Sequence, residues 1–119
     1  QPDEERGCPR CAGYGIKPDE PAYLYCLWYE GPLGDFWKVG IAINVERRRK
    51  ELQTAVSNTK MYHDYRIHVV DKVRIDTGLE ARIAERRALN SVSGFEPAET
   101  FDGSNEFVSE PVELAPYGK

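Results

Sequence analysis

The chain has 119 residues, of which 40% are hydrophobic and 30% are charged, and its formal net charge is −4 at pH 7. This size suits one domain of about 100–150 residues, and the composition excludes collagen-like, low-complexity and fully disordered proteins. The pI of about 5.2 disfavours a general polyanion-binding surface, so a nucleic-acid contact would depend on a local basic patch.

The longest apolar run, around residues 24–29, is far shorter than the roughly 20 residues that cross a bilayer. The N-terminus also lacks the basic and then apolar pattern of a signal peptide. We therefore expect a soluble, cytoplasmic protein with no membrane partner.

Residues 1–21 are rich in Pro, Gly and charge, and they predict a loop-like lead segment. Residues 22–29 are aromatic or aliphatic, residues 30–35 are typical of a turn, and residues 36–43 again favour a strand. This stretch therefore predicts a β-hairpin.

Asn44 is the predicted N-cap of a first helix that begins at Val45 and ends near Ser57, with an acidic residue in its first turn as helix starts prefer. Residues 65–75 alternate between apolar and polar side chains, with one break, and predict a third strand.

The Thr-x-x-Glu pattern at Thr77 and Glu80 is typical of a capping box and predicts a second helix through Val92. Residues 103–108 predict a short closing strand, and residues 111–119 a frayed tail. The order β-β-α-β-α predicts a small α+β fold with a three-stranded mixed or antiparallel sheet flanked by helices. We place the folded domain at residues 22–110, after the lead segment 1–21 and before the tail 111–119.

Five short motifs follow these elements in order: Leu24-Tyr25-Cys26, Trp37-Lys38-Val39-Gly40, Asn44-Val45-Glu46-Arg47-Arg48, Ala81-Arg82-Ile83-Ala84-Glu85 and Gly103-Ser104-Asn105-Glu106-Phe107. Their order and spacing resemble the GIY-YIG nuclease domain across residues 22–108. The second motif has a lysine where the family name implies tyrosine, as is common in the phage-associated branch.

The resemblance implies a metal-dependent endonuclease that hydrolyses DNA phosphodiester bonds, encoded by a phage or another mobile element. It implies Mg²⁺ or Mn²⁺ held by Glu85 as the sole carboxylate ligand, which suits Mg²⁺ because this ion keeps several waters and binds phosphate oxygens. Tyr25 would lie near the attacking water, Arg48 on the phosphate, and Lys38 in the pocket wall. Further candidates for substrate binding are Gly40, Arg47, Arg49 and Asn105.

The helical phase supports an arginine near the sheet. Arg48 lies three residues after Val45 and four before Leu52, which places it on the apolar, sheet-facing side of the first helix. Arg49 has nearly the same phase, and periodicity alone does not choose between them. The alternative is that residues 47–50 form a solvated basic face.

Two glutamates compete for the metal. Glu85 has Ala81, Ala84 and Ala88 as helical neighbours, so it projects from the face that should pack on the sheet, where a carboxylate is costly unless it meets a metal or an arginine. Glu80 is the other candidate, although its place in the capping box already explains it. Tyr25 has a structural alternative too, since it shares a strand face with other large apolar residues and would pack in a core.

The lead segment contains Cys8-Pro9-Arg10-Cys11-Ala12-Gly13-Tyr14-Gly15, which resembles one zinc-binding repeat of the J-domain cochaperones. Structural Zn²⁺ needs four ligands, so Cys8 and Cys11 are half a site. Three explanations are open: a second cysteine pair elsewhere completes the site, two chains share one metal, or the pair is a dithiol that binds no metal. Cys26, inside a predicted strand, is expected to be a buried hydrophobe.

A different class of function is also open, namely a binding or regulatory module that keeps the fold without catalysis. The lysine at position 38 and the net charge of −4 favour it. A third interpretation makes the cysteine pair primary, as a zinc or redox interaction domain. A nuclease of this size would take its specificity from an appended domain or a protein partner.

Overall fold

The computed structural model describes residues 16–92 and 107–117. Its elements, in chain order, are β1 (Ala22–Glu30), β2 (Phe36–Ala42), α2 (Val45–Ser57), β3 (Arg66–Ile75), α3 (Gly78–Asn90), β4 (Phe107–Val108) and the 3₁₀ helix η3 (Ala115–Tyr117). The predicted hairpin, third strand and two helices are all present. Their ends lie within two residues of the predicted positions.

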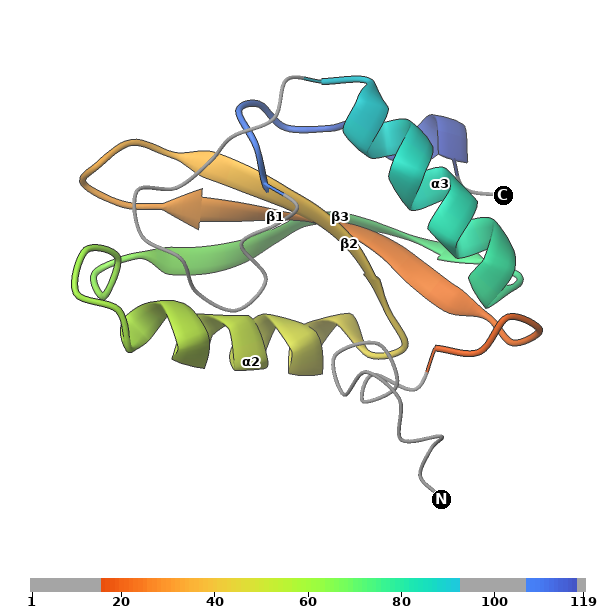
Figure 1. Cartoon of the computed structure of the whole chain (residues 1–119), viewed down its shortest axis with the longest axis horizontal. Helices are drawn as coiled ribbons and strands as arrows, with labels where there is room; N and C mark the ends of the chain where they lie inside the picture. Colours follow the sequence, from red (N-terminus) through yellow and green to blue (C-terminus); the bar gives the residue numbers. More distant parts are fainter. Residues whose placement is uncertain (1–15, 93–106, 118–119) are drawn as a thin grey trace, which may run out of the picture.

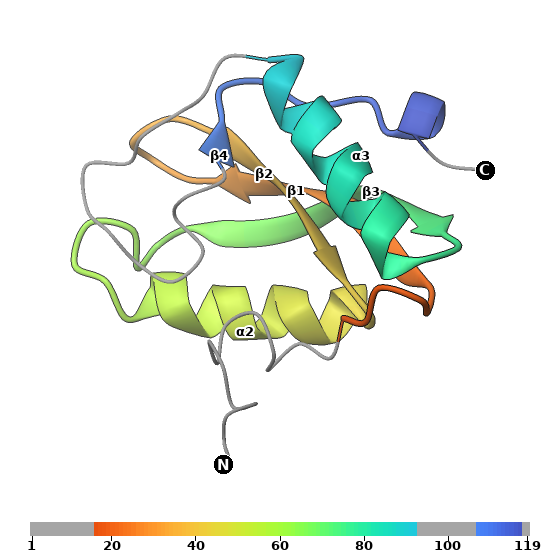
Figure 2. The same cartoon turned by 45° about the vertical axis from the view of Figure 1, so that its right-hand side comes forward.

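The sheet has four strands in the order β3-β1-β2-β4, and every neighbouring pair is antiparallel. The expected three strands are therefore corrected to four. The added strand is β4, where Phe107 and Val108 pair with Lys38 and Trp37 of β2 (Figure 2). It lies within the predicted closing segment, but two residues are too few to show a strand period.

The break in the alternation of β3 is a β-bulge. Leu27 of β1 faces Val69 and Cys26 faces Asp71, so Val70 is an extra residue on β3. An extra residue shifts the side chains that follow it to the other face of the sheet. This explains why Ile67 and Ile75, on the two sides of the bulge, are buried in different cores.

The two helices cover opposite faces of the sheet (Figure 1). The α2-side core contains Tyr25, Leu27 and Tyr29 of β1 together with apolar residues of α2. The α3-side core contains Leu24 and Cys26 with the alanines of α3. Because successive side chains of a strand point to opposite faces, the hydrophobic run of β1 supplies both cores.

Both predicted N-caps are confirmed. The side chain of Asn44 accepts a hydrogen bond from the backbone N–H of Arg47 at 3.0 Å, and the hydroxyl of Thr77 accepts one from Glu80 N–H at 3.2 Å. These bonds satisfy backbone donors that the first turn of a helix leaves without a partner. They fix where α2 and α3 begin.

The part of the tail that the structure describes, residues 111–117, is docked rather than frayed. Val112 is 6% exposed and Leu114 is fully buried, both in the α3-side core. The prediction of a frayed segment from residue 111 is therefore wrong. At the other end, Ile16 packs on the same core and Pro18 O accepts a hydrogen bond from Leu79 N–H at 3.1 Å.

Among the described residues, no helix has the length and apolar character that crossing a membrane requires.

Candidate active site

Two cationic side chains are buried on the face of the sheet that α2 covers. Lys38 is 1% exposed and Arg48 is 8% exposed, and they are the buried charged residues of the described part of the chain. Burying a charge is costly unless other groups compensate it. Both residues are among those that the motif pattern singled out.

Lys38 lies in the middle of β2, with Leu27 opposite it on β1 and Phe107 opposite it on β4. Its Nζ atom is 5.7 Å from the centroid of the Phe107 ring. An ammonium at this distance is attracted by the negative face of the ring. The short strand β4 therefore helps to hold the lysine within the α2-side core.

Arg48 lies on the buried side of α2, together with Val45, Leu52 and Val56. The predicted orientation toward the sheet is confirmed. Its Nη1 atom is 3.3 Å from Oε1 of Glu51, one turn further along the helix. This partly buried ion pair offsets some of the cost of burying the guanidinium.

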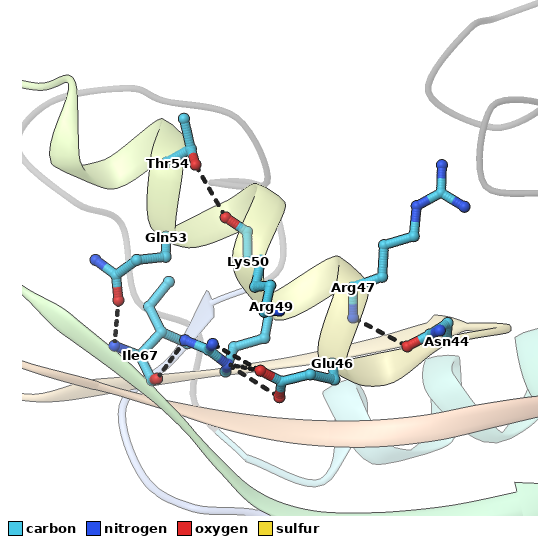
Figure 3. A network of polar contacts seen from close by, with 8 residues as sticks. All are labelled: Asn44, Glu46, Arg47, Arg49, Lys50, Gln53, Thr54 and Ile67. Atoms are coloured by element: carbon cyan, nitrogen blue, oxygen red, sulfur yellow. Dashed lines mark hydrogen bonds and ion pairs between the residues drawn. The ribbon is translucent and has the colours of Figure 1, made fainter.

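The structure separates Arg48 from its two neighbours. The side chain of Arg49 is 23% exposed and binds Glu46, with 2.7 Å between Nη2 and Oε2. Arg47 is 75% exposed, pairs loosely with Glu51 at 3.4 Å, and points away from β3 in Figure 3. Of the three arginines, Arg48 alone is buried, which the helical phase did not decide.

Tyr25 and Gly40 lie opposite each other on β1 and β2. A Cβ atom at position 40 would lie 2.5 Å from the Tyr25 hydroxyl oxygen and 2.7 Å from Cζ. The glycine therefore leaves room for the Tyr25 ring. Tyr25 itself is 2% exposed and belongs to the α2-side core, so the packing role foreseen for it is present.

Glu85 is half-buried on α3, beside the buried residues Ala81, Ala84 and Ala88. Because α3 packs on the opposite face of the sheet from α2 (Figure 2), Glu85 comes from the other layer than Lys38 and Arg48. The alternative ligand, Glu80, is exposed at the start of α3.

The described residues contain no group of three or more His, Cys, Asp and Glu side chains that could hold a metal ion. A single carboxylate is compatible with Mg²⁺, which takes the rest of its ligands from water and phosphate. The donor chemistry of Glu85 therefore fits this ion. Asn105, Cys8 and Cys11 lie outside the described residues.

A second group of cations lies where α2 meets β3. Arg49 donates to Glu46, and this bond is the main cause of the lowered pKa of the Glu46 carboxyl, with smaller contributions from Lys50 and Lys72. Lys72 extends from β3 and lies 5.3 Å from the centroid of the Tyr23 ring. Three cations thus lie near the Glu46 carboxylate.

The sequence motifs did not point to Lys72, because it lies outside all of them. The charge distribution contained a signal: residues 45–75 hold eight of the 16 Lys and Arg residues but four of the 20 Asp and Glu residues. A shallow hollow of about 440 Å³ lies beside this group on α2 and is lined by Asn44, Glu46, Arg47, Lys50, Glu51 and Thr54.

The structure thus brings Tyr25, Lys38, Gly40 and Arg48 to the α2 side of the sheet, and it places Glu85 on the helix of the other side. Comparison of the chain with protein-family models, with curated proteins and with solved structures gave no match.

Proposed function

We propose that this chain is a metal-dependent endonuclease that hydrolyses DNA phosphodiester bonds. The observation that carries the proposal is the burial of Lys38 and Arg48 on one face of the sheet. Two cations are retained there at a cost in stability, which is expected of groups whose role is to bind an anion. A DNA phosphate is the anion that the motif pattern indicates.

Each residue has a task that suits its chemistry. The planar guanidinium of Arg48 can donate two parallel hydrogen bonds to phosphate oxygens, and the ammonium of Lys38 supplies a compact positive charge. The hydroxyl of Tyr25 would orient the attacking water. Hydrolysis forms a bond from this water to phosphorus and breaks the bond to the leaving oxygen, which takes up a proton.

Glu85 would hold Mg²⁺ or Mn²⁺, and the ion would polarise the phosphate and accept negative charge that develops in the transition state. Since Glu85 comes from the opposite layer, the proposal requires its carboxylate to reach the phosphate past an edge of the sheet. Because Lys38 is 1% exposed, it also requires a local movement that opens the α2 side to DNA.

The positive group around Glu46 supports DNA as the substrate. Arg49, Lys50 and Lys72 gather at the junction of α2 and β3, on the same side of the sheet as Lys38 and Arg48. Cations next to a phosphate-binding site attract the DNA backbone through long-range forces that salt screens. A local patch of this kind answers the objection raised by the acidic pI.

The test is nicking of supercoiled plasmid at low salt with Mg²⁺ or Mn²⁺. We expect Glu85→Ala and Arg48→Ala to lose cleavage. The matched controls are Glu80→Ala and Arg47→Ala, which remove an exposed carboxylate on α3 and an exposed guanidinium beside Arg48. Absence of cleavage by the unaltered protein with both metals, on duplex and single-stranded DNA, would overturn the proposal.

A second candidate is a binding or regulatory module with this fold and no catalysis. Lys38 is buried away from solvent and Arg48 is paired with Glu51, and both features favour a protein without catalysis. The two functions differ in linked stability, because a ligand at one hundred times its Kd stabilises a protein by about 2.7 kcal/mol. If Mn²⁺ and an oligonucleotide together cause no thermal shift, the result would favour a binding module with a protein partner.

The Zn²⁺ half-site at Cys8 and Cys11 stays a prediction that a different measurement addresses. Zinc content per chain, determined on protein purified without chelator, distinguishes a metal site from a bare dithiol.

A further inference from the structure

β3 is an outer strand of the sheet and is bonded to β1 on one side. The outer edge of such a strand presents backbone N–H and C=O groups that can pair with a strand of another molecule. Folded proteins usually protect these edges. The groups that bond the outward backbone at the start of β3 therefore show how this edge is protected.

The side chain of Gln53 on α2 binds this edge in the way a neighbouring strand would. Its Nε2 donates to Tyr65 O at 2.8 Å, and its Oε1 accepts from Ile67 N–H at 2.9 Å (Figure 3). In an antiparallel strand these two bonds would come from the N–H and C=O groups of two residues that are two positions apart. The carboxamide thus occupies one acceptor and one donor of the edge that a neighbouring strand would otherwise bond.

Arg49, one turn earlier on α2, extends this contact. Its Nη1 donates to Ile67 O at 3.4 Å (Figure 3). Three outward backbone groups, namely Tyr65 O and both groups of Ile67, are therefore bonded to two side chains of one helix. Arg49 is itself held in place by its ion pair with Glu46.

The second half of the edge is disrupted in a different way. Val70 forms the bulge, and the N–H of Lys72 donates to the carboxylate of its neighbour Asp71 at 2.9 Å. Bulges and charged side chains both hinder the addition of a strand. The regular stretch that could accept a strand is therefore residues 65–69, and the two side chains of α2 bind the backbone of its first part, at Tyr65 and Ile67.

We propose that Gln53 and Arg49 close a latent pairing surface for a second copy of this chain. Ile67 turns its backbone groups outward, and by the alternation of an antiparallel ladder Val69 does so too. A two-fold antiparallel pairing would then set Ile67 opposite its own copy and Tyr65 opposite Val69. Val69 and Val70 are 37% and 48% exposed, so the pairing would also cover apolar surface.

The test is the oligomeric state of the double variant Gln53→Ala/Arg49→Ala, measured by sedimentation velocity over a wide range of protein concentration. The matched control is Thr54→Ala, because the Thr54 hydroxyl donates to Lys50 O within α2. We expect the unaltered protein and the control to be monomers and the double variant to form dimers as its concentration rises.

Amide hydrogen exchange provides the site-specific readout. We expect the Ile67 amide to exchange slowly in the unaltered protein, faster in the dilute double variant, and slowly again in its dimer. Should the double variant fail to fold, Gln53→Glu keeps an acceptor for Ile67 N–H and loses the donor to Tyr65 O, and it should associate more weakly. A double variant that folds and stays monomeric at the highest concentration would overturn the proposal, as would fast exchange of Ile67 in the unaltered protein.

Discussion

The ring of Tyr25 occupies the space that a side chain at position 40 would need, because Gly40 lies directly opposite on the neighbouring strand. This relationship joins two residues that the motif pattern singled out separately. Packing alone explains both the glycine and the position of the ring. It also sets the Tyr25 hydroxyl above β2, on the side of the sheet that contains Lys38.

Gly40→Ala should therefore destabilise the protein by about 1–3 kcal/mol, the usual cost of inserting a methyl group into a packed core. Urea denaturation measures this loss. Adding Tyr25→Phe removes the oxygen nearest to the new methyl group, while the ring carbon at 2.7 Å remains, so the double variant should recover part of the stability. A single variant as stable as the unaltered protein would show that the ring moves freely.

Lys38→Met should separate stability from activity. Replacing a buried charge by an apolar side chain of similar length is often neutral or stabilising, and Lys38 is 1% exposed. We expect an unchanged or higher midpoint of urea denaturation together with loss of plasmid nicking. A variant that is destabilised and still cleaves DNA would assign the lysine a structural role.

Leu114→Ala should cost about 2–5 kcal/mol, as large-to-small substitutions in a core do, because Leu114 is fully buried against the α3-side core. The matched control is Glu113→Ala, since this neighbour is exposed. Thermal and urea denaturation measure both variants. Equal stability of the two would mean that the segment after β4 adds nothing to the core.

Most of the fold could be predicted because its elements have local signals. The hairpin follows from two apolar runs around a turn, and both helices have side chains at Asn44 and Thr77 that cap them as expected. The docked tail could not be predicted in this way. Val112 and Leu114 are two isolated apolar residues separated by Glu113, and only the packing of α3 on the sheet creates the core that buries them.

In the candidate site, too, some features have a local sequence signal and others depend on how the elements pack together. The spacing of Arg48 to Val45 and Leu52 places it on the buried side of α2, but Arg49 has nearly the same phase, so the sequence did not show which of the two is buried. The place of Lys72 beside Glu46 depends on the packing of α2 against β3, and no pattern within one element shows it. The layer in which Glu85 lies is likewise a property of the whole sheet.

The ion pair of Glu46 predicts a loss of stability in acid. The pKa of the Glu46 carboxyl is lowered below its ordinary value of 4.5, first by the hydrogen bond from Arg49. A lowered folded-state pKa contributes stability above the unfolded value, and this contribution is lost as pH falls below about 4.5 through the lowered pKa. The effect should be small, because the pair is exposed to solvent.

Denaturation of Glu46→Gln and of the unaltered protein at pH 7 and in mild acid measures this contribution. We expect the two proteins to differ in stability at pH 7 and to converge as the carboxyl becomes protonated. A difference between them that does not change with pH would show that the carboxylate charge contributes nothing.

Lys50→Ala/Lys72→Ala should weaken DNA binding without abolishing the fold, because both side chains are exposed at the junction of α2 and β3. Each phosphate contact that is lost lowers the slope of log affinity against log salt by about one. The matched control is Arg82→Ala/Arg86→Ala, which removes two exposed cations from α3. Both pairs lower the net charge equally, so a difference between them reports where the DNA lies.

Binding is measured by fluorescence anisotropy on a labelled duplex at several salt concentrations, without metal and in the Glu85→Ala background, so that cleavage does not interfere. We expect a slope reduced by up to about two for the Lys50/Lys72 pair and little change for the α3 pair. Equal effects of the two pairs would mean that net charge alone attracts DNA. A larger effect of the α3 pair would move the DNA to the face that contains Glu85, where it would approach the metal ligand from the α3 side of the sheet.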